Sequence, residues 1–282
     1  MKIPKGLQPL VEDGLVDAVV RRLQSGKEAS VYVVRCGERL CCAKVYKDAD
    51  HRGFHKLAQY REGRKARGSR DARASGRGTR YGRQLQESEW QNAEIQALYR
   101  LARAGVRVPQ PTGVHEGVLL MELLLDAQGH PAPRLNQVEL APEQARAWHR
   151  FMIAQIVLML CAGLIHGDLS DYNVLIDAGG PVIIDLPQAV DAAGNNNAFA
   201  MLERDVNNMR AAFASAAPEL LDTDYALEIW SLYESGELKP DGALTGRFAR
   251  PSAAVDVAAV LEQIEAERRE AELRLARLAS SA

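Results

Sequence analysis

The feature that most constrains the fold is a polar cluster between apolar segments, at residues 164–177, LIHGDLSDYNVLID. An apolar run from Phe151 to Ile165 precedes it, and a β-rich segment follows it directly. A second apolar segment, PVIIDLPQAV, carries another carboxylate, Asp185. Apolar segments of this kind must pack together, so the polar residues are expected where a helix and two strands end. The apolar run is too short to span a bilayer, which needs about 20 residues.

The polar residues of these segments are spaced as a catalytic and metal-binding set. Asp168 and Asn173 lie on the loop between helix and strand, and we expect the strand before Asp185 to pair with residues 174–176 as a hairpin. Asn173 and Asp185 would then converge, and their oxygens suit Mg²⁺, with Mn²⁺ as a possible substitute. Asp168 would be free to accept a proton. Each residue alone, like Asp171, reads as a turn or cap, but the set matches the protein-kinase template.

The first part of the chain predicts strands and one important helix. Residues 12–23 read as an amphipathic entry segment, and two β-rich runs around Gly37, at 31–46, read as a hairpin. Lys44 lies in an apolar strand, where an unpaired ammonium group is costly to bury. Glu94, on a helix predicted at 87–104, is the best candidate for its partner.

Two further segments are expected to contact a nucleotide. The turn in SGKEASVY (25–32) can bring backbone N–H groups to phosphate oxygens. The strand in VLLMEL ends where its backbone can meet an adenine edge. The contacts are predicted from Ser25, Gly26, Lys27, Ser30, Lys44, Glu94, Met121, Glu122 and Leu124.

Composition and the remaining segments complete the organisation. Hydrophobic residues make up 47% and charged residues 26%, as in ordinary globular proteins. Segment 51–84 is rich in Arg and Lys, so it predicts a mobile basic loop or a weak helix. Helices are predicted at 142–162, at 199–214 and, terminally, at 252–279. The four cysteines, Cys36, Cys41, Cys42 and Cys161, fit no zinc spacing, and with the polar N-terminus they favour a cytoplasmic location.

These motifs resemble the RIO family of atypical serine/threonine protein kinases, over about residues 19–215, and look like its bacterial branch. SGKEASVY resembles the family's phosphate-binding loop, CAKVY its lysine strand and WQNAEIQAL its glutamate helix. VLLMELL resembles the hinge and APRL the segment after it. HGDLSDYNVL resembles the catalytic loop, IIDLPQAV the metal-binding loop, and LERDVNN (202–208) the helix that follows.

The resemblance implies an α+β, bilobal protein-kinase-like fold, with a small β-rich N-lobe, a helical C-lobe and no activation segment. A helical C-terminal extension is also expected. The implied limits are an N-terminal extension at 1–18, the kinase-like domain at 19–217 (N-lobe to about 121, hinge 122–125, C-lobe 126–217) and the extension at 218–282.

The resemblance also implies the chemistry. ATP and Mg²⁺ would be the cofactors, Asp168, Asp185 and Lys44 the catalytic residues, and Asn173 and Asp185 the metal ligands. The family associates the residue matching Asp185 with an aspartyl-phosphate intermediate, so some members act as ATPase switches. The basic segment resembles a flexible loop that carries autophosphorylation, for which Ser69, Ser75 and Thr79 are candidates.

The function predicted is ATP-dependent phosphoryl transfer to serine or threonine of an unknown protein substrate, autophosphorylation included, or ATP hydrolysis as a conformational switch. A pseudokinase is disfavoured because every expected catalytic position is filled. One alternative is a small-molecule phosphotransferase of the aminoglycoside type, against which SGKEASVY and DLPQ argue. Another is a nucleotide-gated module that binds RNA or a ribosomal particle through residues 51–84. No membrane partner is expected.

Overall fold

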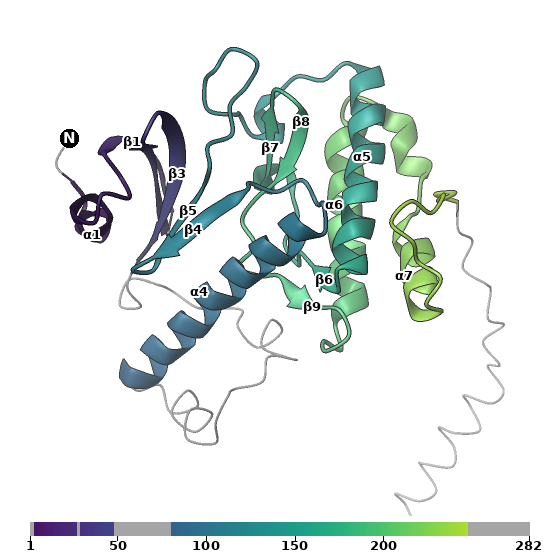
Figure 1. The fold of residues 1–282 in the computed structure, drawn as a ribbon. Helices are drawn as coiled ribbons and strands as arrows, with labels where there is room; N and C mark the ends of the chain where they lie inside the picture. Colours follow the sequence, from purple (N-terminus) through teal and green to yellow (C-terminus); the bar gives the residue numbers. More distant parts are fainter. Residues whose placement is uncertain (1–2, 27–28, 48–79, 248–282) are drawn as a thin grey trace, which may run out of the picture. The chain divides into compact units, whose positions relative to one another are not determined.

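The structure is a computed structural model that describes residues 3–26, 29–47 and 80–247 (Figure 1). The described residues form one compact unit that ends at Arg247. The predicted terminal helix at 252–279 and the three candidate phosphorylation sites lie outside the described residues, as does Lys27. Within the described part, no helix is both long and apolar enough to cross a membrane.

A five-stranded antiparallel sheet forms the first lobe, with the strand order β1-β2-β3-β5-β4. The strands are β1 (Ala18–Ser25), β2 (Ala29–Cys36), β3 (Arg39–Tyr46), β4 (Pro111–His115) and β5 (Val118–Glu122). The hairpin predicted around Gly37 is confirmed, because β2 and β3 pair in unbroken register and Gly37 has a φ of +62°. The short elements η1 (Lys5–Leu7) and α1 (Gln8–Glu12) precede the sheet.

The interpretation of residues 12–23 as an amphipathic entry segment is wrong. Helix α1 ends at Glu12, and strand β1 begins at Ala18. Register shifts interrupt the pairing of β1 with β2 between Val19 and Arg21, and again between Arg22 and Gln24. Such bulges break the two-residue alternation by which a strand is recognised in a sequence.

Helix α4 (Arg80–Arg103) lies between β3 and β4 in chain order, and it begins earlier than the predicted 87. It therefore includes the last residues of the segment predicted as a loop or weak helix. Residues 51–79 of that segment lie outside the described ranges. The start at residue 87 was predicted from the stripe of apolar residues in this helix. Arg, Gln and Glu are also good helix formers, so the residues before 87 extend the helix toward its N-terminus. Gly105, with a φ of +79°, ends it as predicted, and Val106 N donates to Leu101 O.

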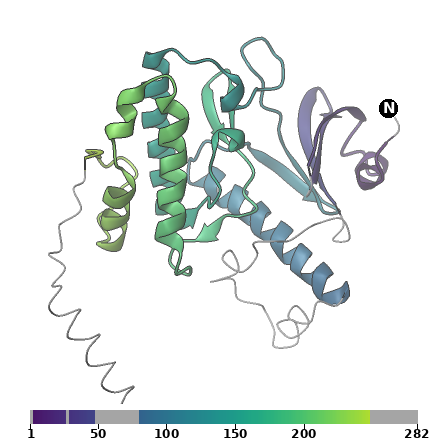
Figure 2. The same ribbon diagram turned by 180° about the vertical axis from the view of Figure 1, so that it is seen from behind.

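The second lobe is mainly helical. Helices α5 (Pro142–Cys161) and α6 (Ala198–Ala214) lie side by side in both views (Figures 1 and 2). They confirm the helices predicted at 142–162 and 199–214. The other elements are η3 (Leu135–Gln137), β6 (Leu164–Ile165), η4 (Asp171–Asn173), β7 (Val174–Asp177), β8 (Gly180–Ile183), β9 (Val190–Asp191), η5 (Pro218–Asp222) and α7 (Ala226–Glu234). Strands β7 and β8 form the predicted hairpin, while β6 pairs with β9, which the sequence did not predict.

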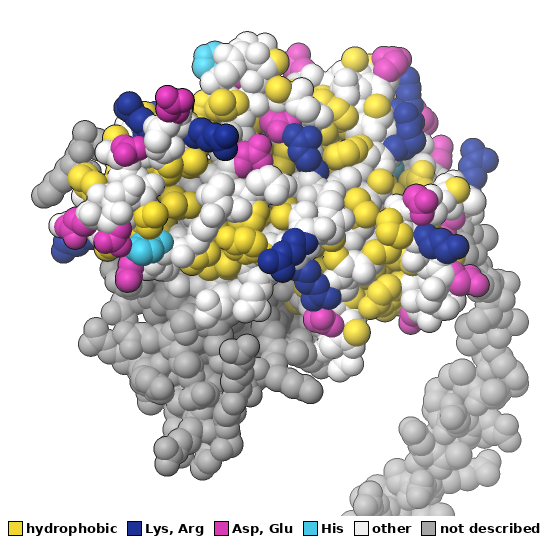
Figure 3. Space-filling view, viewed as in Figure 1, with side chains coloured by type: hydrophobic (Ala, Val, Ile, Leu, Met, Phe, Trp, Pro, Cys, Tyr) yellow, Lys and Arg dark blue, Asp and Glu magenta, His cyan; other side chains and the backbone are white. Residues whose placement is uncertain are grey.

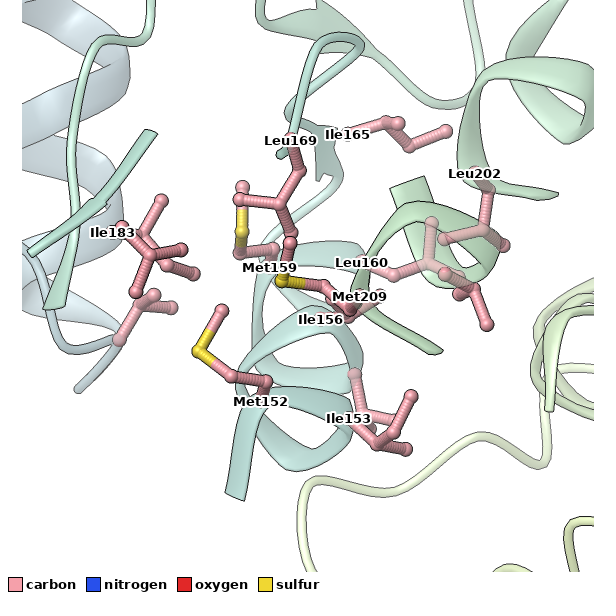
Figure 4. Close-up of a cluster of buried hydrophobic side chains, with 14 of the residues drawn as sticks. Met152, Ile153, Ile156, Met159, Leu160, Ile165, Leu169, Ile183, Leu202 and Met209 are labelled. Atoms are coloured by element: carbon pink, nitrogen blue, oxygen red, sulfur yellow. The ribbon is translucent and has the colours of Figure 1, made fainter. Parts of the chain in front are cut away.

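The main hydrophobic core lies between α5, α6 and the β7–β8 hairpin, and it fixes the polar loop that was the starting point of the sequence analysis. Figure 4 shows Leu169, from the middle of that loop, in a cluster with Met159, Leu160 and Met209. Leu169 is fully buried. Burial of a leucine side chain stabilises by about 2 kcal/mol, so the loop is held to the core at its centre. The predicted α+β fold with a β-rich and a helical lobe is confirmed; the three domain limits stay a prediction.

Candidate active site

A cavity of about 580 Å³ lies between the sheet and the helical lobe. Leu23 and Val31 from the sheet, and Leu175 and Ile184 from the β7–β8 hairpin, give it apolar walls on both sides. The predicted hinge also lines it, through residues 122–124. Its volume is in the range of small-molecule pockets, and two apolar walls suit a flat ring.

Lys44 on β3 projects into this cavity and contacts two carboxylates. Its ammonium forms the predicted ion pair with Glu94 on α4, and it also lies 2.9 Å from Oδ1 of Asp185. Only 12% of the Lys44 side chain and 5% of the Glu94 side chain are exposed. Burial works against the charge, but the two carboxylates outweigh it and hold the pKa of Lys44 above its usual value. The lysine is therefore positively charged at neutral pH.

Tyr46, two residues further along β3, adds to this pair and was not predicted. The Lys44 ammonium lies 5.7 Å from the centroid of the Tyr46 ring, within cation–π range. Burial and the neighbouring Glu94 carboxylate raise the pKa of Tyr46, so its hydroxyl stays protonated. The tyrosine thus packs beside the lysine and the glutamate without adding charge.

Asp185 stands just after β8 in an unusual backbone conformation. Its φ of +65° lies in the left-handed region, which costs a non-glycine residue about 1–2 kcal/mol. Burial tends to raise the pKa of its carboxyl, but Lys44 outweighs this effect and holds that pKa below its ordinary value. The side chain is still 46% exposed, so an ionised carboxylate faces the cavity. Backbone strain of this kind is concentrated at functional sites.

Asn173 lies next to Asp185 because the hairpin brings the two together. Ile184 N donates to Asn173 O at 2.9 Å, and Val174 pairs with Ile183. Asn173 Nδ2 donates to Asp168 O at 2.9 Å, which directs its amide oxygen away from that bond. Asn173 and Asp185 both line the cavity, as the sequence predicted that they would converge.

This pair of oxygen donors fits a hard divalent cation. No group of three or more His, Cys, Asp or Glu side chains that could hold a metal exists among the described residues. A Mg²⁺ ion here would take two protein oxygens, from Asn173 and Asp185, and the rest from phosphate groups and water. Mg²⁺ sites at bound phosphates have this composition.

Asp168 is exposed beside the cavity rather than being one of its lining residues. Its Oδ2 accepts a long hydrogen bond, 3.5 Å, from Gln188 Nε2, and its backbone N donates to His166 Nδ1. The His166 ring in turn contacts Ile184 O at 3.1 Å. The exposed carboxylate is open to a hydroxyl that approaches from solvent.

Asp205 on α6 fixes the loop that carries Asp168 through hydrogen bonds to its backbone. Asp205 is 2% exposed, and its two oxygens accept hydrogen bonds from Gly167 N (2.8 Å) and Leu169 N (2.9 Å). Asn208, one turn later, donates to Leu169 O. Burial raises the pKa of Asp205 to about 6. No role for Asp205 was predicted from the sequence, although a carboxylate on the apolar face of a helix, between Leu202 and Met209, is a recognisable signal.

The predicted phosphate turn is partly described. Gly26 lines the cavity, whereas Ser25 and Ser30 do not, although their hydroxyls lie 3.3 Å apart where β1 and β2 meet. Lys47, which was not predicted, donates to Ser25 Oγ at 3.2 Å and to Gly26 O at 2.5 Å. The remaining predicted contacts, Lys44, Glu94, Met121, Glu122 and Leu124, all line the cavity.

Comparison with known proteins points to one family. A sequence model described as "RIO1: RIO domain" matches residues 30–226. The chain is 36% identical over 214 residues to "RIO-type serine/threonine-protein kinase Rio1" of Haloferax volcanii, which covers 72% of this chain and 66% of the relative. It is 31% identical over 125 residues to "Serine/threonine-protein kinase rio1" of Schizosaccharomyces pombe, which covers 44% of this chain and 25% of the relative.

A solved structure of a kinase domain also aligns, with a TM-score of 0.44 and 14% sequence identity, over 78% of this chain and 67% of the other. That likeness is too low to bear on the fold. The chain spans just under two thirds of its Haloferax relative and a quarter of its Schizosaccharomyces relative.

Proposed function

The chain belongs to the RIO domain family, and from this premise we propose that it transfers the terminal phosphoryl group of ATP to serine or threonine hydroxyls, its own included. The observation that carries the proposal is the position of Lys44, whose ammonium contacts both Glu94 and Asp185 inside a cavity of about 580 Å³. A fixed cation next to a metal-binding carboxylate is what phosphoryl transfer requires, because its catalysis is mainly positioning and charge stabilisation.

Four polar side chains that line the cavity have roles in this proposal. Lys44 binds the phosphate oxygens, and Glu94 holds the lysine in place. Asn173 and Asp185 would hold Mg²⁺, which would neutralise the negative charge on the phosphates. The apolar walls and the hinge, residues 122–124, hold the base of the nucleotide.

Asp168 acts on the acceptor. Its exposed carboxylate orients the acceptor hydroxyl and takes its proton as the hydroxyl oxygen bonds to the γ-phosphorus. The bond between that phosphorus and the β–γ bridging oxygen breaks, and ADP keeps this oxygen. Asp205 and Leu169 keep the loop of Asp168 fixed, through the hydrogen bonds and the burial described above.

The acceptor decides whether the output is phosphorylation or a hydrolytic switch. The resemblance of the IIDLPQAV segment suggests Asp185 itself as one acceptor, and an aspartyl phosphate would then be hydrolysed by water. This output and transfer to serine or threonine use the same cavity and the same cation. They differ in the chemical stability of the product.

The test is mass spectrometry of the chain after incubation with Mg-ATP. Acid-stable phosphoserine or phosphothreonine supports transfer to hydroxyls, and an acid-labile phosphate on Asp185 supports the switch. The Asp168→Asn variant should lose the acid-stable product. A wild-type chain that binds Mg-ATP but yields neither product, and releases no phosphate, would refute the proposal.

The two alternatives considered from the sequence gain no support. No residue of the described site favours a small-molecule acceptor over a protein hydroxyl. Residues 51–79 of the basic segment proposed to bind RNA lie outside the described residues. The RNA or ribosomal partner, the bacterial branch and the cytoplasmic location stay predictions from the sequence.

A further inference from the structure

An arginine that the sequence analysis did not single out lies at the cavity and connects its two sides. Arg134 comes from the segment after the hinge, and its Nη2 donates to Gln24 Oε1, on β1, at 2.9 Å. Both side chains line the cavity, Gln24 as an exposed residue and Arg134 as a half-buried one. This hydrogen bond therefore joins the strand before the phosphate turn to the helical lobe at the rim of the cavity.

Backbone hydrogen bonds fix the position of Arg134, and therefore the point from which its side chain extends. Arg134 N donates to Gln137 Oε1 at 3.0 Å, and Arg134 forms an isolated antiparallel bridge with Leu175. Leu135, the next residue, is 5% exposed and packs in the main core. Leu175 lies two residues after Asn173, so the arginine starts beside the strand that presents the metal-binding amide.

The charge of Arg134 is less compensated than that of Lys44, the other described cation that lines the cavity. Lys44 contacts two carboxylates, whereas the partner of the Arg134 guanidinium is a neutral amide. Within the described ranges, no carboxylate lies at ion-pair distance from Arg134, although its field reaches the carboxylate of Asp185. A guanidinium has five N–H donors, of which the bond to Gln24 uses one, and it binds phosphate well. Figure 3 shows basic and acidic side chains interspersed on the viewed face of the described part, with no broad basic patch on that face.

We propose that Arg134 is a further nucleotide-binding residue, which contacts the phosphate chain of bound ATP or ADP and, through Gln24, holds β1 across the nucleotide. The proposal rests on the proposed function for the identity of the ligand. In this proposal two cations bind the phosphates: Lys44 on β3 and Arg134 from the segment after the hinge. The phosphate chain is then bound from both lobes, and release of the nucleotide requires the Arg134–Gln24 bond to open.

The test measures binding, so it does not depend on phosphoryl transfer. The dissociation constants of adenosine, ADP and ATP are measured by calorimetry for the wild type and for Arg134→Gln, which keeps a hydrogen-bonding side chain but removes the charge. We expect Arg134→Gln to weaken ADP and ATP at least about tenfold, the effect of losing one charge-assisted hydrogen bond. Adenosine binding should stay within about twofold, because it has no phosphate.

Two more variants separate the charge from the bridge. Arg134→Lys keeps the charge without the planar fork, and it should recover part of the lost ATP affinity. Gln24→Ala keeps the charge but removes its anchor, and it should speed ADP dissociation in stopped-flow experiments by about threefold or more. Arg146→Gln is the matched control, since this arginine on α5 pairs with Glu143 and Glu219 and does not line the cavity. All variants are first checked for an unchanged thermal unfolding temperature.

Two results would overturn the inference. Equal weakening of adenosine, ADP and ATP in Arg134→Gln would mean that Arg134 only shapes the cavity, and unchanged affinities would mean that its bond to Gln24 is incidental. Failure of the proposed function is distinguishable. A chain that binds ATP through Arg134 but transfers no phosphate supports the inference and refutes the proposed function, whereas a wild type that binds none of the three ligands refutes both.

Discussion

The Nζ atom of Lys44 lies 2.9 Å from Oδ1 of Asp185, so an ion pair joins the sheet to the end of the β7–β8 hairpin across the cavity. The same ammonium also contacts Glu94 on α4. One lysine thus holds two carboxylates from two other elements. A divalent cation bound to Asp185 would share that carboxylate with Lys44, which would couple metal binding to the position of Lys44.

The first prediction concerns the buried Lys44–Glu94 pair. Lys44→Met should lower the free energy of unfolding by about 3 kcal/mol, because it leaves the Glu94 carboxylate buried without a cation. Phosphoryl transfer should fall to background. Denaturant unfolding and a radiolabelled ATP assay measure the two effects.

Adding Glu94→Gln to Lys44→Met removes the stranded carboxylate, so it should recover part of the stability without restoring transfer. Lys239→Met, at an exposed lysine, is the matched control and should change stability by less than about 0.5 kcal/mol. A double variant no more stable than Lys44→Met alone would show that the buried charge is not the cause of the loss.

The second prediction separates the two aspartates. Asp168→Asn should lower the transfer rate by about 10²- to 10⁴-fold, the usual contribution of a proton acceptor. Its affinity for Mg-ATP should stay within about threefold of the wild type, because Asp168 does not line the cavity. Asp185→Asn should instead raise the Mg²⁺ concentration needed for binding, since it removes a carboxylate ligand. Calorimetric titrations at several Mg²⁺ concentrations measure both effects.

Asp171→Asn is the control for Asp168→Asn, because it changes another carboxylate of the same loop. The Asp171 side chain forms none of the bonds to cavity residues described above. Its transfer rate should stay close to that of the wild type. If Asp168→Asn and Asp185→Asn weaken nucleotide binding equally, the division of roles between proton acceptor and metal ligand is wrong.

The sequence predicted those parts of the site that depend on local pairing. Asn173 and Asp185 flank one hairpin, so the convergence of these residues followed from the expected pairing of β7 with β8. The Lys44–Glu94 pair followed from the cost of burying a lone cation in an apolar strand. In both cases a physical requirement, strand pairing or neutralisation of a buried charge, was enough to predict which residue would be the partner.

What the sequence did not predict depends on tertiary packing or on irregular backbone. Strand β1, whose end carries Gln24, was not recognised in the sequence because its bulges break the alternating pattern. Arg134 reaches that residue only because the two lobes face each other, and no periodic pattern marks a contact between positions so far apart. Asp205 was visible as a polar residue on an apolar helix face, but the loop that it supports could be identified only in the structure.

The third prediction concerns that support. Asp205→Asn should lower the free energy of unfolding by about 2 kcal/mol. The carboxylate accepts from both Gly167 N and Leu169 N, whereas an amide offers one oxygen and turns an N–H₂ group toward the other donor. The transfer rate should also fall, because the loop of Asp168 is no longer fixed. Asp222→Asn, at an exposed carboxylate, is the control for both measurements. Unchanged stability in Asp205→Asn would contradict the support role.

The fourth prediction concerns the dependence of stability on pH. His149 on α5 is 1% exposed, and its ring packs edge-on against Phe213 and tilted against Tyr225. Neither ring nitrogen has a hydrogen-bond partner within the described part of the chain. Burial, with smaller contributions from Arg210 and Arg150, lowers its pKa to about 4. Between pH 6.5 and pH 4 the unfolded chain therefore binds a proton that the folded protein does not. The contribution of His149 alone should lower the free energy of unfolding by about 3 kcal/mol as the pH drops through this range.

The shift of Asp205 acts in the opposite direction and must be separated. Its folded pKa of about 6 exceeds the ordinary 3.8, so the folded protein takes up this proton first and gains stability as the pH falls through that interval. Comparison of the wild type with His149→Leu isolates the histidine, because both chains keep Asp205. From neutral pH to about pH 4, urea unfolding should show His149→Leu gaining about 3 kcal/mol relative to the wild type. His130→Leu, at a histidine side chain that is 76% exposed, should show no such gain. Parallel stability curves for the wild type and His149→Leu would mean that the folded protein accommodates the protonated ring.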